Sequence, residues 1–302
     1  IQTTTQLDTI RALSVQTVEG YIMTSTGDTA HWFNGPMDIT IWDKMQQSIT
    51  RDNDEPKEAN KVKIPFNNYP NTLFAGQTIV ENGKFSYTFM VPKDIRYNYG
   101  NGRIAYYAYD KESGEEGIGY CEDFVVGGSS TLEIIDTIGP DLRLYINNPA
   151  FVDGGKTYEF PHFYAEIYDE NGINTVGSGI GHDLLLIVDN DPNQTFVLND
   201  YFTARSNSYQ QGTVSFKMPE MTEGAHAITF RAWDLLNNSN TAALNFQVVK
   251  GMNPTLYKVL TYPNPVAATG VLNFRIECDQ PDEVVQTEIY LYDLSGRLIK
   301  TH

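Results

Sequence analysis

Apolar and polar residues alternate one by one along much of the chain, and this period of two predicts β-strands rather than helices. The clearest example is residues 85–91, where Phe, Tyr, Phe and Val alternate with Ser, Thr and Met. The same alternation recurs in residues 163–168, 228–233 and 285–292. Nineteen Tyr and fifteen Phe suit half-buried pleated surfaces better than helix faces. The pattern therefore predicts an all-β fold.

Clusters of turn residues separate these alternating segments. They occupy residues 81–83, 98–102, 153–155, 189–192 and 237–240. Asn and Gly, which dominate them, tolerate the positive φ that tight hairpin turns require. We expect short strands joined by hairpins.

One short pattern occurs more than once. Residues 103–110 and 227–234 share the order Ile, any residue, aromatic, any residue, Ala, aromatic, Asp, and residues 289–296 hold a weaker copy. The final Asp is expected to end the strand by accepting hydrogen bonds from the backbone of the next turn. Such endings recur in two-sheet sandwiches, so the repeat predicts separate modules built alike.

Two polar or glycine-rich segments, Gly127–Ser130 and Lys250–Pro254, are interpreted as linkers. They predict tandem immunoglobulin-like β-sandwich modules at 1–128 and 131–249, followed by residues 252–302, the first part of an incomplete third β-sandwich.

Mixed charge between Asp43 and Lys63 suggests a long solvated loop in the first module. Its charged residues include Asp52, Asp54, Glu55, Lys57 and Glu58.

The two ends suggest a piece of a larger protein. The chain opens on Ile1 without the features of a signal peptide, and Ile299–His302 falls within a strand-like pattern.

Net charge narrows the possible partners. Lys and Arg number 21 and Asp and Glu 38, which gives −17. Such a chain is repelled by phosphate backbones and anionic lipid, so we expect no nucleic-acid partner. The longest aliphatic run, Leu184–Val188, is far shorter than the ~20 residues of a membrane helix, so we also expect no direct membrane span.

The sequence offers no clear nucleophile. Cys121 and Cys278 lie far apart in different predicted modules, which predicts neither a disulfide framework nor a zinc site. A catalytic cysteine needs a histidine within hydrogen-bond reach, and Glu122 and Asp123 next to Cys121 disfavour a thiolate. The five histidines are His31, His162, His182, His226 and His302. We expect both cysteines to be small hydrophobic residues and predict no catalytic residue.

Two acidic segments carry oxygen ligands of the kind Ca²⁺ takes, namely Asp169-Glu170-Asn171-Gly172 and Asp189-Asn190-Asp191. Both are equally ordinary turn signals, and the full spacing of an EF-hand is missing. The pair His182-Asp183 is either half of a zinc site or a loop histidine with its partners, and Gly177–His182 is interpreted as a bulged loop. We predict no cofactor and no metal ligand.

Several motifs together indicate a family. They are residues 18–22, 33–35, 91–95, 136–140, 169–174, 179–183, 197–201 and 230–238. This set resembles the region after the peptidase domain of the surface sortases of the type IX (Por) secretion system, members of the gingipain family of cysteine peptidases. Tyr262-Pro-Asn-Pro265 and residues 289–300 are similar to the opening half of the C-terminal signal domain of that secretion route.

The resemblance implies a parent that removes C-terminal signals from secreted cargo at the cell surface and helps attach the product to anionic lipopolysaccharide. The catalytic Cys and His would lie in a domain before Ile1, so this chain would itself be no enzyme but a scaffold that carries a secretion and docking signal. The implied partners are that peptidase domain, an outer-membrane β-barrel protein, other secretion components and cargo signal domains. The implied location is the cell surface or outer membrane, reached through the periplasm.

A second class of function stays open, that of an adhesin or carbohydrate-binding module of a type IX cargo protein. Trp32, Trp42 and Tyr99 could stack on sugar rings or belong to a core. Arg297 and Lys300 in the tail could serve in signal recognition or act as edge charges that block aggregation.

Overall fold

The computed structural model describes residues 1–51, 63–131, 134–175, 181–267, 270–280 and 286–302. Regular structure in these residues consists of β-strands and two three-residue 3-10 helices, so the predicted all-β fold is confirmed. The charged residues expected in a loop between Asp52 and Glu58 lie outside the described residues, as do Gly177–Ile180 of the expected bulged loop.

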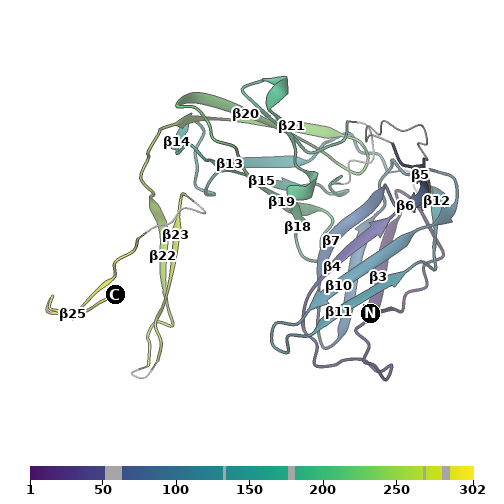
Figure 1. Ribbon diagram of the computed structural model, residues 1–302, viewed down its shortest axis with the longest axis horizontal. Coiled ribbons are helices and arrows are strands. Elements are labelled where there is room, and N and C mark those ends of the chain that lie inside the picture. The colour runs from purple at the N-terminus through teal and green to yellow at the C-terminus, as the bar shows by residue number, and fades with distance from the viewer. Residues whose placement is uncertain (52–62, 132–133, 176–180, 268–269, 281–285) are drawn as a thin grey trace, which may run out of the picture. The chain divides into compact units, whose positions relative to one another are not determined.

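The first twelve strands build one β-sandwich. They are β1 (Gln2–Thr3), β2 (Thr9–Ala12), β3 (Val15–Tyr21), β4 (Gly35–Trp42), β5 (Gln46–Ile49), β6 (Pro65–Asn68), β7 (Thr72–Val80), β8 (Lys84–Met90), β9 (Gly100–Asn101), β10 (Arg103–Tyr109), β11 (Glu116–Cys121) and β12 (Val125–Ser129). Its two main sheets have the strand orders β11-β10-β4-β7 and β1-β3-β8 (Figure 1). A third sheet, β2-β12-β9, and the β5-β6 hairpin complete it.

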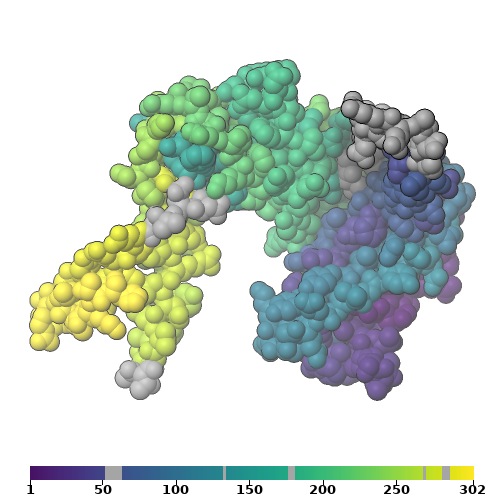
Figure 2. Space-filling model, in the orientation of Figure 1, coloured from purple at the N-terminus to yellow at the C-terminus, as the bar shows by residue number. Residues whose placement is uncertain are grey.

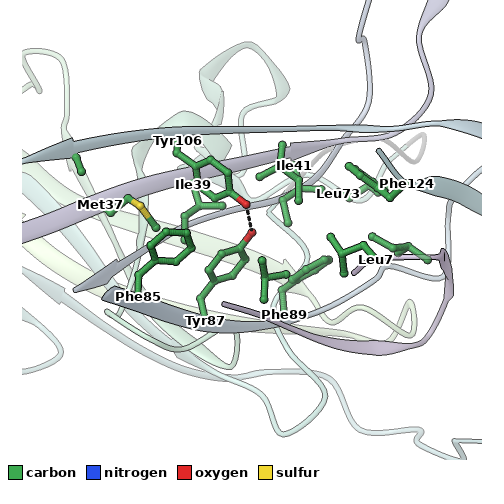
Figure 3. Packing of buried hydrophobic residues seen from close by; sticks show 14 of the residues in the cluster. Leu7, Met37, Ile39, Ile41, Leu73, Phe85, Tyr87, Phe89, Tyr106 and Phe124 are labelled. Carbon is green, nitrogen blue, oxygen red and sulfur yellow. Dashed lines mark hydrogen bonds between the residues drawn. The ribbon is translucent and has the colours of Figure 1, made fainter. Parts of the chain in front are cut away.

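An aromatic and aliphatic core holds the two main sheets together. Phe85, Tyr87 and Phe89 of β8 point toward Met37 and Ile39 of β4 (Figure 3), and all five side chains are buried. The alternation in residues 85–91 therefore places one face of β8 in the core, as predicted.

The polar ends of two core tyrosines meet inside this sandwich. The hydroxyls of Tyr87 and Tyr106 lie 3.2 Å apart (Figure 3), and Tyr106 also pairs with the Thr3 hydroxyl at 3.0 Å. Burial raises the pKa of both tyrosines, so they stay neutral and satisfy each other.

The segment Gly127–Ser130, expected to be a linker, is mostly strand. β12 runs through Gly127 and Gly128 and pairs with β2 in parallel, with a register shift between Val126 and Ser129. Gly128 has a φ of 71°, and a Cβ there would meet the Tyr99 hydroxyl at 2.6 Å. These glycines therefore form a bulge under a tyrosine ring and not the linker that the sequence predicts. The sequence predicts a linker here because bulges and linkers both favour glycine.

A buried ion pair lies beside this sheet. The Lys44 ammonium is 2.6 Å from the Asp43 carboxylate and donates to the carbonyl oxygen of Arg96 at 2.7 Å. Both charged side chains are buried, and no pattern in the sequence indicated this pairing.

The next group of strands forms a second β-sandwich. They are β13 (Asp141–Ile146), β14 (Gly155–Thr157), β15 (His162–Tyr168), β16 (Leu185–Val188), β17 (Thr195–Val197), β18 (Phe202–Ala204), β19 (Gln211–Lys217), β20 (Gly224–Trp233) and β21 (Ser239–Val248), with 3-10 helices η1 (Pro192–Gln194) and η2 (Asn199–Tyr201). The two sheets have the orders β13-β15-β19-β18 and β14-β21-β20-β16-β17. Phe196 of β17 and Phe216 of β19 meet across the sheets with ring centroids 5.2 Å apart.

The repeated strand-ending Asp does what the sequence predicted. Asp110 Oδ1 accepts from the backbone N–H of Glu112 at 2.8 Å, and Asp234 Oδ1 accepts from Leu236 at 2.9 Å. In the weaker copy, Asp293 Oδ1 accepts from the N–H of Ser295 at 2.9 Å. Each carboxylate thus fixes the turn after its strand.

The described chain divides into two compact units. One comprises Ile1–Leu144, Tyr164–Phe216 and His226–Asn245, and the other comprises Tyr145–Phe163, Lys217–Ala225 and Phe246–His302. The first unit contains strands of both predicted sandwich modules, so the junction between those strands can be described.

The junction has an apolar centre. Met90, at the end of β8, packs with Leu235 and Leu236 from the turn after Asp234, and all three are buried. Leu13, Ile134 and Tyr209 pack around them. Burial of side chains from both modules makes the junction part of the folded core.

Hydrogen bonds flank this centre. The Lys93 N–H donates to the Leu235 carbonyl at 3.0 Å, and Asn237 Nδ2 donates to Asp94 Oδ1 at 2.8 Å. On another side, the Asn207 N–H donates to the carbonyl of Gln77 at 2.9 Å. Backbone groups of both modules are therefore satisfied across the junction.

The tail consists of two hairpins, built from β22 (Leu256–Tyr262) with β23 (Asn273–Cys278) and from β24 (Tyr290–Tyr292) with β25 (Leu298–Thr301). They form narrow ribbons in Figure 2, and every residue of β22, β24 and β25 is exposed. The alternation predicted for residues 285–292 yields the strand β24 without a buried face, because a two-stranded ribbon has no second sheet to cover it. Val285 lies outside the described residues.

The junction generates a stability prediction. Leu235→Ala removes a buried side chain that packs against Met90, so we expect it to lower the free energy of unfolding by about 2–4 kcal/mol. The measurement is urea denaturation of the whole chain. Leu256→Ala, at a position 52% exposed, serves as control and should change stability by less than about 0.5 kcal/mol. Equal effects of the two substitutions would show that the junction contributes no packing energy.

Candidate functional site

Three carboxylates meet in the second sandwich. Asp136 precedes β13, Asp169 follows β15 and Asp234 follows β20, and one carboxylate oxygen of each lies within 4.8 Å of the other two. Asp169 and Asp234 are buried. Among the described residues this is the group of acidic side chains best placed to share a proton or a cation, and we call it the acid cluster.

Hydrogen bonds from two asparagines hold the members of the acid cluster. Asp169 Oδ1 accepts from the Asn171 N–H at 2.7 Å, and the amide of the Asn171 side chain donates to Asp136 Oδ2 at 2.6 Å. The Asn238 side chain donates to Asp234 Oδ2 at 2.7 Å and to the backbone carbonyl of Asp136 at 3.2 Å. Two asparagines thus tie the three carboxylates together.

Burial controls the electrostatics of the cluster. It raises the pKa of Asp169 to about 6, and the neighbouring charges of Asp234 and Asp136 add to the effect. The pKa of Asp234 is raised as well, mainly by burial, against the hydrogen bonds from Asn238 and Leu236. The described ion pairs include no Lys or Arg partner for these carboxylates, and protonation of Asp169 relieves the repulsion among them.

The sequence identified only one member of this cluster. Asp169 was a candidate calcium ligand, and the structure brings it to Asp136 and Asp234 rather than to the segment 189–191. Carboxylate oxygens are ligands that Ca²⁺ takes, and a full shell of six to eight oxygens would need further ligands or bidentate binding by these three residues. The strand-ending position of Asp234 in the repeated pattern was the available signal for a buried carboxylate, whereas Asp136 is placed by tertiary contacts.

The other acidic candidates serve local structure. Asp189 Oδ2 is 2.7 Å from His226 Nδ1, and Asp189 Oδ1 accepts from the N–H of Ala227. Asp191 Oδ1 accepts from the N–H of Asn193 at the start of η1. These contacts are those of an ordinary turn, one of the two interpretations given for residues 189–191.

His182 is also a junction residue. Its Nδ1 lies 2.7 Å from Asp94 Oδ2, and its ring centroid is 4.4 Å from that of Trp233. The described contacts of His182 are therefore with Asp94 and an indole, and none of them is with Asp183.

The two cysteines lie in different surroundings. Cys121 packs at the edge of the first core, and its neighbours include Tyr87 and Tyr106. Cys278 donates to the carbonyl of Gln280 at 3.4 Å. Both are half-buried and unbridged, as expected of small hydrophobic residues.

The three candidate sugar-stacking residues have different contacts. Trp32 Nε1 donates to Glu115 in the β10–β11 turn, whereas Trp42 pairs in register with Arg103 at the opposite end of β10. Tyr99 covers the bulge glycines of β12. No described helix is long and apolar enough to cross a membrane.

The acid cluster generates a pH prediction. Asp169 has a pKa of about 6 when folded and ~3.9 when unfolded, so the folded state binds the extra proton between these values. The stability that Asp169 contributes is full below pH ~4 and is lost as the pH rises through about 6. Asp169→Asn keeps an acceptor for the Asn171 N–H but removes the charge. We expect this variant to be more stable than the wild type at pH ~7.5 by about 1–2 kcal/mol, with the difference vanishing below pH ~4.

Urea denaturation across this pH range, in buffer containing EDTA so that only protons titrate the cluster, measures the effect. Asp200→Asn, at an exposed position, is the matched control and should give a difference that does not follow this pH dependence. A wild type that is the more stable protein at neutral pH would contradict the prediction.

Searches of protein-family descriptions and of curated proteins find no match for this chain. Among solved structures, the crystal structure of dimeric latent PorU from Porphyromonas gingivalis matches with 30% sequence identity and a TM-score of 0.51, covering 98% of this chain and 27% of that chain. Immunoglobulin domains 1–4 of Sidekick-1 cover 97% of this chain and 65% of that chain at 9% identity, but their TM-score of 0.21 is too low to carry an argument.

The match to PorU runs through both sandwiches and the tail hairpins. The chain spans about a quarter of the length of the PorU chain, 27%, so the activity of that whole protein is a separate question. With 98% of its residues aligned at 30% identity, this chain is a PorU-related region made of β-sandwich modules.

Proposed function

We propose that this chain is a non-catalytic segment of a PorU-like protein of the type IX secretion system, where it supports a separate peptidase domain and carries a secretion or docking signal in its tail. The single observation that carries the proposal is the alignment of 98% of the chain with PorU at 30% identity. In this proposal the parent removes C-terminal signals from cargo at the cell surface, and its partners are an outer-membrane β-barrel and cargo signal domains.

The packing of the first unit supports a scaffolding role. Two sandwiches that share the buried side chains Met90 and Leu235 can transmit a fixed orientation. A flexible linker would let each module turn independently, whereas here backbone hydrogen bonds cross the junction. Such a block can hold an attached domain at a constant position.

The chemistry of the described residues also supports a non-catalytic role. His182 and His226 pair with carboxylates, and Cys121 packs against a tyrosine-rich core. A cysteine peptidase needs a thiol within hydrogen-bond reach of an imidazole. These carboxylate pairs place His182 and His226 in structural contacts, with Asp94 and Asp189.

Arg297 and Lys300 in the tail were considered for two roles, signal recognition and edge charges that block aggregation. Arg297 is engaged locally, since its Nε lies 3.3 Å from Asp293 Oδ2 in the β24–β25 turn. Lys300 lies in the exposed strand β25. The apolar residues of these ribbons are open to further strands, which fits a segment that docks.

A cleavage assay tests the proposal. The purified chain is incubated, under reducing conditions, with a cargo protein that bears a type IX C-terminal signal, and the products are followed by mass spectrometry. We expect the cargo to stay intact. Cys121→Ser and Cys278→Ser are matched controls and should behave like the wild type. Cleavage by the wild type that either substitution abolishes would place a peptidase within this chain and overturn the proposal.

A further inference from the structure

The outer face of strands β10 and β11 exposes large apolar side chains. Ile118 is 76% exposed, Tyr120 65% and Tyr107 42%. Scattered exposed apolar residues are ordinary, but contiguous ones mark interaction surfaces. Ile118, Tyr120 and Tyr107 form such a surface only if the strand register makes them neighbours.

Strand register places them together. Ile118 of β11 lies directly opposite Tyr107 of β10, and Tyr120 lies opposite Ala105. All of them point away from the core, because Ile104, Tyr106 and Ala108 occupy the buried face of β10. Strands β4, β10 and β11 run side by side in Figure 1, so the three large side chains cover neighbouring positions of one sheet.

Arg103 orders the aromatic side chains at one end of this face. Its guanidinium lies 5.2 Å from the ring centroid of Tyr120 and 5.8 Å from that of Tyr69. Tyr69 in turn packs on Trp42, with ring centroids 6.3 Å apart. Tyrosine, tryptophan and arginine held in this way lose little entropy on binding, which is why they dominate binding hot spots.

Acidic residues surround the apolar centre. The hairpin from Arg103 to Asp123 contains two basic residues, Arg103 and Lys111, and six acidic ones. Asp110 is buried in its turn and Glu122 is paired with Arg103 at 3.6 Å, which leaves four exposed acidic residues, Glu112, Glu115, Glu116 and Asp123. Asp38 of β4 adds a carboxylate opposite Tyr107. The face therefore combines an apolar centre with a negative rim.

This charge pattern selects the partner. A negative rim attracts lysine and arginine and repels phosphate, anionic glycan and acidic protein surfaces. A second copy of the chain is a poor partner, because it would bring an identical acidic rim and a net charge of −17. The partner that fits this face is therefore a cationic polypeptide with apolar side chains between its charges.

We propose that the outer face of β10 and β11, centred on Ile118, Tyr120 and Tyr107, binds a cationic polypeptide segment in which lysine or arginine alternates with apolar residues. Apolar side chains of that segment pack on Ile118 and Tyr120, and its cations meet Glu116 and Asp38. This inference does not depend on the proposed scaffolding role.

Fluorescence anisotropy of labelled peptides with the 302-residue chain tests the proposal. The probes are two capped peptides of about ten residues, the upper length of an ordinary strand. One alternates arginine with valine and the other alternates glutamate with valine. We expect the arginine peptide to bind, the glutamate peptide not to bind, and higher salt to weaken the complex.

Two double variants separate the face from general stickiness. Ile118→Ser with Tyr120→Ser should weaken binding of the arginine peptide by about tenfold or more. Val152→Ser with Val197→Ser, at positions 74% and 55% exposed elsewhere, should leave it unchanged. Because all four side chains are exposed, the variants should keep the wild-type circular-dichroism spectrum, which is checked first.

Three outcomes would overturn the proposal. The first is equal binding of the two peptides, and the second is undiminished binding by the Ile118→Ser, Tyr120→Ser variant. The third is self-association of the wild type that this variant abolishes, measured by analytical ultracentrifugation, since the face would then bind a second copy.

Discussion

The carboxylate that ends a strand and holds the following turn is the interaction on which the rest of this structure depends. Asp110 fixes the turn between β10 and β11, so it sets the register that places Ile118 opposite Tyr107. Asp234 fixes the turn that carries Leu235 into the junction and Asn238 into the acid cluster. One local device thus positions an exposed face, a buried polar group and the contact between two sandwiches.

Local features of the fold could be predicted from the sequence because they depend on neighbours along the chain. The alternation around Phe89 specifies which face of β8 is buried, and the pattern ending in Asp234 specifies a turn. The role of Gly128 was misjudged, because a bulge and a linker both favour glycine and only the covering ring of Tyr99 distinguishes them. The structural role of a glycine depends on what packs against its backbone.

The acid cluster and the junction could not be predicted, since their members are distant in sequence. Nothing near Asp136 indicates that Asn171 will reach its carboxylate, and nothing near Met90 indicates a contact with Leu235. Both groups use residues from the turn after β20, which is where the two sandwiches meet. In this PorU-related region, polar and apolar residues of the turn after β20 connect the two sandwiches. This is consistent with a structural role for the turn rather than a catalytic one.

The buried ammonium of Lys44 has a consequence for how the first sandwich finds its register. One partner of Lys44, the carboxylate of Asp43, is adjacent in sequence. The other, the backbone carbonyl of Arg96, comes from the segment after β8. The carbonyl of Val126 on β12 lies 3.5 Å away. A buried pair of this kind adds little net stability, and Asp43 stays beside Lys44 in any register because the two are neighbours in sequence. A slipped alignment of the other segments would instead remove the carbonyls of Arg96 and Val126 and leave the buried ammonium short of acceptors, so Lys44 favours the alignment that supplies them.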